Sequence, residues 1–289
     1  MREAAEQPTA RSTSNREPET TCEVHARRIE TSHDGTLPPG TPLEIAVESP
    51  ITIEISHNGT YTLMCSPRDQ RALAAGFLFT EGLIASVQDI GNLQCCPDNP
   101  NTVRAELLNA GAGKENNARN LVVMSSCGLC GTTKLDTLLA RLQPIEPTLA
   151  ITATGVRAAS EALSAHQSVY PRTGGTHAAA VFNAAGTTIA FAEDIGRHNA
   201  LDKAIGMCLL SGRTTDQCGV ALSGRVSLEM VLKCARARLQ IITAVSAPTS
   251  LAVHAAQHAR ITLCAFVRND HATVFTHPER IRTPDDAHL

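Results

Sequence analysis

Two cysteines three positions apart, Cys127 and Cys130, are the most reactive pair of side chains in the sequence. A thiol is a nucleophile only as the thiolate. An apolar run at 121–124 predicts a strand and the leucine spacing over 134–142 predicts a helix, so the pair falls at a helix N-terminus. The unpaired N–H groups there can lower a thiol pKa from about 8.5 to between about 3.5 and 7.5. The glycine after each cysteine leaves room for a bulky partner.

A single C-x-x-C serves as half of a zinc site, as a redox dithiol, as a sulfur carrier, or as two ordinary loop thiols. Zinc would need two further ligands, for which His177, His198 and Cys95 are the candidates. A zinc deaminase also needs H-x-E ahead of Pro-Cys-x-x-Cys, whereas the H-x-E here follows the cysteine pair. A thioredoxin-like dithiol belongs in a small domain of its own and gives the polar motifs below no role.

Four polar motifs form a second signal, and each falls where a predicted strand gives way to a helix. In α/β sheets these turns bind ligands: glycine admits the ligand to the backbone, arginine and helix N-termini hold phosphates, and histidine moves protons. The motifs occupy residues 174–177, 193–203, 223–229 and 246–249. The candidate ligand-binding residues within them are Gly175, His177, Arg197, His198 and Arg225.

Ordinary structural roles compete with this interpretation. Ser227, Asn199 and Thr249 are suitable helix caps. Asp202 and Lys203 are typical of charged residues on a solvated helix face, and His177 is typical of a hydrogen-bonded core residue. Arg197 and Arg225 are typical of residues in weak surface ion pairs. Taken together, the motifs predict a thiol loop that faces an anion-binding cleft, with a large, polar, phosphorylated ligand.

The elements that position these residues are predicted from hydrophobic periodicity and turn residues. Residues 1–40 are polar and predict a disordered tail. A hairpin around Asn58-Gly59 and a helix after residue 69 follow, and Pro144 and Pro147 mark a domain seam. The predicted domains are thus 1–40, 41–145 and 146–289. From residue 178 a hairpin is followed by alternating strands and helices, with helices from 199, 227 and 249, which predicts an α/β fold with a largely parallel or mixed sheet.

Composition excludes some functions. With 3% aromatic residues, no Trp and a net charge of -3, the chain lacks the usual features of a nucleic-acid-binding surface. No apolar run approaches the roughly 20 residues of a membrane span, and the N-terminus lacks a signal core, so we expect a cytoplasmic protein without a membrane partner. Its ten cysteines should then be free, and those at 208, 218, 234 and 264 should lie in the core.

Together the motifs resemble the formate dehydrogenase accessory sulfurtransferase family, FdhD. The resemblance spans about residues 41–281. It rests on SCGLCG at 126–131, GGTHAA from 174, EDIGRHNALDK at 193–203, SGRVSLEM from 223 and SAPT at 246–249, and the helix from residue 67 also fits.

The resemblance implies a cytidine-deaminase-like, three-layer mixed sheet with helices on both faces, without the deaminase zinc, and a smaller N-terminal α+β subdomain. It implies a homodimer that takes sulfur from a cysteine desulfurase as a cysteine persulfide. The sulfur passes to bis-molybdopterin guanine dinucleotide, bound as cargo without direct metal ligation, before the cofactor enters formate dehydrogenase. Cys127 matches the persulfide cysteine and Cys130 its companion. The segment that contacts the cofactor matches Phe266, Val267, Arg268, Asn269, Asp270 and His271.

Some positions depart from the family pattern. His271 stands where Arg is frequent, and Asn269-Asp270 where Gly is usual, which affects the expected cofactor contact. Arg238 and Arg260 replace glycines and Gln240 a proline; these three are expected to alter turns only. We assign Arg197, Arg225 and Arg268, as a hypothesis, to the phosphates or guanine ends of the cofactor. A thiol-disulfide oxidoreductase and a non-catalytic cofactor chaperone remain the alternatives.

Overall fold

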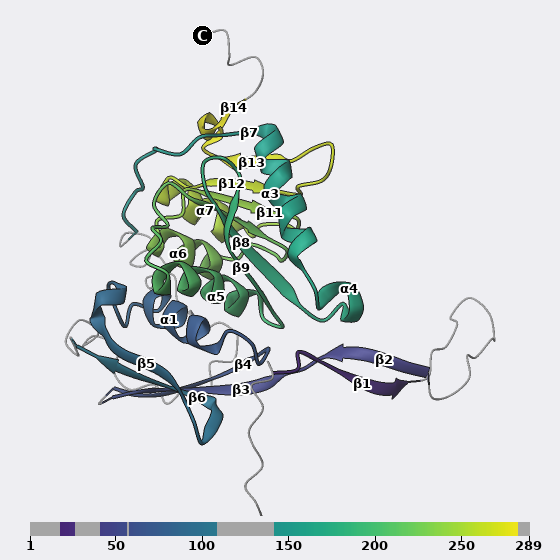
Figure 1. The fold of residues 1–289 in the computed structure, drawn as a ribbon. Helices are drawn as coiled ribbons and strands as arrows, with labels where there is room; N and C mark the ends of the chain where they lie inside the picture. Colours follow the sequence, from purple (N-terminus) through teal and green to yellow (C-terminus); the bar gives the residue numbers. More distant parts are fainter. Residues whose placement is uncertain (1–17, 27–40, 57, 109–141, 283–289) are drawn as a thin grey trace, which may run out of the picture.

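The computed structural model describes residues 18–26, 41–56, 58–108 and 142–282. Cys127, Cys130 and the strand predicted at 121–124 lie outside these residues, as does nearly all of the helix predicted at 134–142. The described chain contains a large mixed sheet with helices and a smaller N-terminal sheet with one helix (Figure 1).

The large sheet has six strands in the order β13-β12-β11-β10-β8-β9. β10, β11 and β12 are parallel, β8 runs against β10 and β9, and β13 runs against β12. β9 to β12 therefore end at one edge of the sheet, where β8 and β13 begin. The strands are β8 (His177–Phe182), β9 (Thr188–Asp194), β10 (Gly219–Leu222), β11 (Ile241–Ala244), β12 (Thr262–Ala265) and β13 (Thr273–Thr276).

Helices cover both faces of this sheet, as the family resemblance implies (Figure 1). Alternation along β8 sends Ala178, Ala180 and Phe182 into one core cluster, with α3, and Ala179 and Val181 into the other, with α5, α6 and α7. The helices are α3 (Ala153–His166), α4 (Tyr170–Thr173), α5 (Arg197–Leu210), α6 (Leu228–Arg236) and α7 (Ser250–Ala259). β7 (Ile151–Thr152) pairs with β14 (Ile281–Arg282) at the margin. The more specific likeness to cytidine deaminase stays a prediction.

The N-terminal subdomain is a four-stranded sheet in the order β4-β3-β6-β5, with α1 on one face. Its apolar residues alternate, so that Ile51, Ile53 and Ile55 are buried beneath the helix. The hairpin at Asn58-Gly59 and the helix after residue 69 are both confirmed. The elements are β3 (Ser49–Ile55), β4 (Gly59–Cys65), α1 (Gln70–Thr80), β5 (Ile90–Cys96) and β6 (Asn99–Leu107).

A two-stranded ribbon corrects the prediction of a featureless tail. β1 (Thr21–Ala26), which lies within the predicted tail, pairs antiparallel with β2 (Thr41–Ala46). Figure 1 shows the ribbon extending sideways from the small sheet. The prediction failed for residues 21–26 because a six-residue strand surrounded by polar sequence carries too little periodicity to be recognised.

Two of the three turn substitutions behave as expected. Arg238 and Arg260 take left-handed backbone angles, with φ of 55° and 56°, the conformation for which glycine is favoured. Gln240 does more than alter a turn, because its buried side-chain oxygen accepts hydrogen bonds from the backbone N–H groups of Thr148 and Leu149 at 3.0 and 2.8 Å. Gln240 therefore ties the segment before α3 to the sheet.

Helices α1 and α5 join the two parts of the molecule by packing at glycines. A Cβ on Gly76 would lie 1.8 Å from the Asp202 carbonyl oxygen, and one on Gly206 would lie 1.9 Å from the Ala72 carbonyl oxygen. Only glycine allows the two backbones to approach so closely. The N-terminal subdomain is thus held directly against the helix that carries the 193–203 motif.

A buried ion pair fixes the same junction. Lys203 Nζ lies 2.6 Å from Asp194 Oδ2, both side chains are fully buried, and Lys203 also donates to the Ser66 carbonyl oxygen at 3.0 Å. Asp194 accepts from the Ser66 backbone N–H at 3.0 Å. Asp202 and Lys203 are therefore not solvated helix charges; Asp202 is paired with Lys233 at 2.9 Å beside Thr80 and Glu81.

Gly206→Ala should destabilise the protein, although Ala is the better helix former by about 1 kcal/mol. The added methyl group collides with the backbone of α1 and must push the helices apart, at a cost of roughly 1–3 kcal/mol or more. Urea unfolding followed by circular dichroism measures the change. Ser164→Ala, at an exposed position within α3, controls for the helix propensity of alanine. A Gly206→Ala variant as stable as the wild type would contradict the close helix contact.

Candidate functional site

The predicted polar motifs meet at the edge of the large sheet where β9 to β12 end. Ser223, after β10, accepts a hydrogen bond at its Oγ from the Ala178 backbone N–H at 2.8 Å. Val226 donates its N–H to Ala247 O at 3.1 Å, which joins the loops after β10 and β11. Arg268 Nη1 donates to Val245 O at 2.7 Å, which joins the loops after β11 and β12. Residues of the 223–229 and 246–249 motifs and of the segment 266–271 therefore lie along one edge of the sheet.

His177, Arg197 and Gly224 pack closely at this edge. A Cβ on Gly224 would lie 3.2 Å from His177 Nδ1 and 3.4 Å from the Cβ of Arg197, so a larger residue would push the two side chains away. Burial and the positive charges of Arg197 and Arg225 lower the pKa of His177. The imidazole is therefore neutral at pH 7, within 3.4 Å of Ser223 Oγ. His177 is a half-buried member of the site rather than a core residue.

His198 is also held neutral. Its burial, together with the charges of Arg197 and Lys233, lowers its pKa to about 4. Its Nε2 lies 3.1 Å from Glu229 Oε2 but without the geometry of a hydrogen bond. The contact is thus one between a neutral ring and a carboxylate at pH 7, not an ion pair.

The segment after β12 forms the exposed side of the edge. Phe266 has a φ of 53° and its ring centroid lies 6.2 Å from that of Phe275. Both rings and Arg268 are exposed. His271 Nδ1 lies 2.7 Å from Asp270 Oδ1, and this hydrogen bond lowers the pKa of Asp270. The remaining members of the predicted segment, Val267 and Asn269, are buried and exposed respectively.

The 193–203 motif divides between site and scaffold. Arg197 and His198 lie at the edge, whereas Asp194, Asp202 and Lys203 are buried. Asn199 is not a cap: it lies inside α5, and its Nδ2 donates to Asp194 Oδ1 at 3.0 Å and to Met64 O at 2.8 Å. Its place at the start of a predicted helix suggests a cap, but its hydrogen-bond partners lie in β4 and β9.

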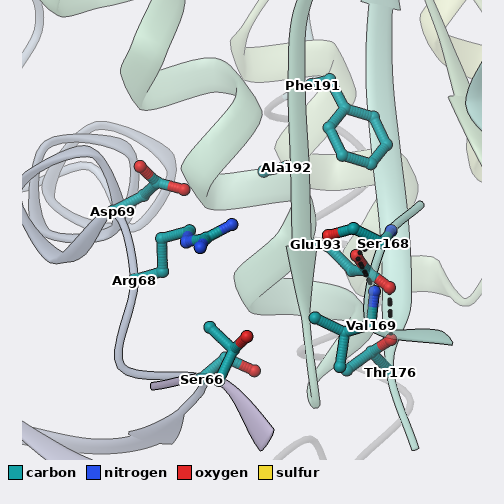
Figure 2. Close-up of a pocket in the computed structure, with 10 residues that line it drawn as sticks. Ser66, Arg68, Asp69, Ser168, Val169, Thr176, Phe191, Ala192 and Glu193 are labelled. Carbon is teal, nitrogen blue, oxygen red and sulfur yellow. Dashed lines mark hydrogen bonds between the residues drawn. The ribbon is translucent and has the colours of Figure 1, made fainter. Parts of the chain in front are cut away.

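A small cavity of about 90 Å³ lies near this site, where the N-terminal subdomain meets β9. In Figure 2 Arg68 extends into it from one wall and Glu193 lies on the other. Glu193 accepts hydrogen bonds from the backbone N–H groups of residues 168–170 and from Thr176 Oγ1 at 2.6 Å. Burial alone would raise the pKa of Glu193, but these four bonds lower it. Sequence reasoning missed Glu193 because its donors are mostly backbone groups.

Gly175 and the predicted core cysteines can also be placed in the structure. Gly175, predicted as a ligand contact, is exposed, but a Cβ there would lie 3.1 Å from the Cβ of Ala46 in β2, so it faces the ribbon. Among the described cysteines, burial raises the pKa of Cys65 and Cys264 to about 12 and that of Cys208 to about 11. The four predicted core cysteines are all buried, and none of them is a nucleophile at neutral pH.

The described residues contain no group of three or more His, Cys, Asp or Glu side chains arranged to hold a metal ion. Within the same residues, no helix combines the length and apolar character required to cross a bilayer.

The family model described as FdhD/NarQ matches residues 46–282. The chain belongs to the FdhD/NarQ family. Proteins named "Sulfur carrier protein FdhD" are similar to it over most of its length. The one from Anaeromyxobacter dehalogenans strain 2CP-1 is 37% identical over 253 residues, covering 82% of this chain and 88% of that protein. The one from Thermoplasma acidophilum is 37% identical over 243 residues, covering 82% and 86%.

A crystal structure of a putative formate dehydrogenase accessory protein from Desulfotalea psychrophila has a similar fold. The TM-score is 0.71 with 24% sequence identity, and the match covers 91% of this chain and all of the other. The FdhD/NarQ resemblance inferred from the five motifs is thus confirmed, and the mixed α/β fold agrees with a solved structure.

Replacing His198 by Gln should flatten part of the pH dependence of stability. The folded-state pKa, about 4, lies below the ordinary value of 6.5, so the unfolded chain takes up the proton first. Stability from this group is complete above pH 6.5 and is lost as the pH falls towards 4, by up to roughly 3 kcal/mol. Urea unfolding at several pH values measures the difference between variant and wild type. His258→Gln, on the exposed side of α7, controls for loss of a histidine, and parallel profiles for wild type and His198→Gln would exclude the neutral buried ring.

Proposed function

We propose that this protein is a sulfur carrier for the maturation of formate dehydrogenase. Cys127 takes sulfur from a cysteine desulfurase as a persulfide, and the sulfur passes to the molybdenum of bis-molybdopterin guanine dinucleotide before that cofactor enters the enzyme. One observation carries the proposal: the Cys127-Gly-Leu-Cys130 sequence is present in a chain 37% identical to proteins named as sulfur carriers. The cationic, motif-lined edge of the sheet supports it, because the cargo is anionic.

Loading balances as an exchange between sulfur atoms. The Cys127 thiolate attacks the outer sulfur of the donor's persulfide. The donor's S–S bond breaks as the new bond to Cys127 forms, and the donor cysteine leaves as a thiolate. No net oxidation occurs. A low thiol pKa favours this step, since the attacking species is the thiolate.

Release requires a second thiol. The Cys130 thiolate attacks the sulfur of Cys127, the bond to the outer sulfur breaks, and the outer sulfur leaves as hydrosulfide with the bonding electron pair. A Cys127–Cys130 disulfide results, which a dithiol reductant returns to two thiols before the next cycle. The hydrosulfide is the form in which sulfide can replace an oxygen ligand of molybdenum.

The residues at the edge fit an anionic cargo. Arg197, Arg225 and Arg268 are cations without a carboxylate partner among the described residues, and arginine binds phosphates in a bidentate manner. His177 is neutral there, so it can donate or accept a hydrogen bond without adding charge. The exposed Phe266 ring offers a flat apolar surface to a purine or pterin ring. When bound, the cargo supplies the metal that accepts the sulfur.

Persulfide mapping tests the carrier step. After incubation with a cysteine desulfurase and cysteine, mass spectrometry should locate one added sulfur on Cys127, and Cys127→Ala should lose both the added sulfur and the rescue of formate dehydrogenase in cells that lack this protein. The exposed Cys95 gives the matched control, Cys95→Ala, which should load and rescue normally. Full rescue by Cys127→Ala would favour the non-catalytic chaperone instead.

Arginine variants separate delivery from loading. Arg225→Gln and Arg268→Gln should keep the persulfide on Cys127 but lower formate dehydrogenase activity in cells by roughly tenfold or more, because each removes a charged hydrogen bond to the cargo. Arg157→Gln, in an exposed pair with Glu161 on α3, is the control. A thiol-disulfide oxidoreductase needs no such edge, so insulin reduction that persists in these variants, with formate dehydrogenase activity unchanged, would favour that alternative.

A further inference from the structure

The ribbon of β1 and β2 has an apolar face that is exposed. Among the described residues, the two strands are hydrogen-bonded to each other and to no other strand. Directly opposed residues of an antiparallel pair lie on the same face. Cys22 opposes Ile45 and Val24 opposes Leu43, so these four side chains share one face. Leu43 and Ile45 are 43% and 42% exposed, and large apolar residues that are exposed side by side mark an interaction surface.

The other face of the ribbon turns towards the body of the protein. It carries Glu44 and Ala46, and Glu23 opposes Glu44. Arg172 in α4 pairs with Glu44 at 2.9 Å, and a Cβ on Gly175 would lie 3.1 Å from the Cβ of Ala46. The ribbon therefore presents its charged side inward and its apolar side outward. A sheet with one solvated face normally has the opposite arrangement.

These inward contacts stabilise the ribbon only weakly. A two-stranded ribbon is marginally stable in water unless its apolar face packs against another layer. Both members of the Arg172–Glu44 pair are nearly half exposed, and exposed ion pairs contribute little to stability. The ribbon therefore needs a cover on its apolar face whenever it is folded. Figure 1 shows the ribbon reaching sideways beyond the small sheet, where it can contact another molecule.

Charge and permanence favour a second copy of this chain as that cover. None of the four side chains on the apolar face is acidic or basic, because Glu23 and Glu44 lie on the opposite face. Such a face can pack on its own copy across a two-fold axis without bringing like charges together. Homodimer interfaces are also more apolar than those with transient partners. A transient partner leaves the ribbon uncovered for part of the time, whereas a second copy covers it in every folded molecule.

We propose that the apolar face of the β1–β2 ribbon, formed by Cys22, Val24, Leu43 and Ile45, is the surface through which two copies of this chain associate. The two faces meet about a two-fold axis, so that each ribbon supplies the cover that the other lacks. Association and stabilisation of the ribbon are then one equilibrium. The family resemblance implies a homodimer but assigns no surface to it, and this inference does not depend on the sulfur-carrier proposal.

The oligomeric state of the full-length protein tests this interface. Sedimentation equilibrium should show a dimer for the wild type. Leu43→Glu and Ile45→Glu should each weaken association by roughly tenfold to a hundredfold, because each places a charge inside an apolar contact. Leu251→Glu is the matched control: Leu251 lies in α7 with 41% exposure, so this variant should stay dimeric. Circular dichroism should give the same spectrum for all four proteins.

Thiol labelling gives a second measurement that needs no variant. Cys22 on the ribbon and Cys95 on β5 are both exposed in the single chain. Peptide mapping after brief treatment with iodoacetamide should show Cys22 reacting several-fold more slowly at concentrations where the protein is dimeric than where it is monomeric. Cys95 should react at the same rate at both concentrations, because it lies outside the ribbon.

A wild type that stays monomeric throughout the micromolar range would overturn the proposal, and so would a dimer that both glutamate variants leave intact. A monomer in which Cys22 is protected would assign the face to another part of the same chain. Protection of Cys22 only after addition of a cysteine desulfurase or formate dehydrogenase would assign it to that protein. Either result rejects the second copy as the cover of the ribbon. Persulfide loading of Cys127 is assayed separately, so the carrier proposal stands or falls independently of this interface.

Discussion

The ion pair between Asp194 and Lys203 is the interaction on which the arrangement of the site depends. Asp194 ends β9, Lys203 lies in α5, and both bond to the backbone of Ser66 in the N-terminal subdomain. A second Asp194 oxygen accepts from the Gly196 N–H at 2.8 Å, which fixes the turn just before Arg197. One carboxylate thus joins the sheet, the helix and the subdomain. Removing one partner from such a pair costs about 3–5 kcal/mol, because the other charge stays buried.

This interaction explains how one motif serves both structure and binding. The early residues of α5 lie at the edge of the sheet, while Asp202 and Lys203, more than one turn later, face α1 and the junction. The glycines of α1 and α5 bring those backbones into contact, so the two parts of the molecule cannot slide past each other without breaking buried charge pairs. The described residues on either side of 109–141, the stretch that contains Cys127 and Cys130, are hydrogen-bonded one to each part of the molecule. Leu108 is bonded to Asp89 in the subdomain, and Ile145 is bonded to Ala259 in the large domain.

The parts of the fold that the sequence predicts are those governed by periodicity. The alternation along β8, the helix of α1 and the burial of the core cysteines follow from local patterns of apolar residues. The collection of motifs at one edge follows from the parallel order of β10 to β12. Polar residues whose partners are distant in sequence could not be assigned. Lys203 pairs with Asp194 and bonds Ser66, 137 residues away, and Gln240 holds residues 91 and 92 positions earlier. The prediction for Ser227 was wrong for a different reason: its position before α6 predicts a helix cap, but its side chain does not form the capping hydrogen bond.

Electrostatics gives a reason for combining two neutral histidines with unpaired arginines. In the function proposed above, the thiolate, the persulfide and the phosphorylated cargo are all anionic, so bringing them together would cost Coulomb energy that grows as water is excluded. Protonated histidines would also neutralise this charge, but their charge would vary over the physiological pH range. At this edge burial and the arginines hold His177 and His198 neutral, while arginine stays charged at any pH a cell reaches. The positive charge that an anionic ligand would meet at this edge is therefore constant with pH.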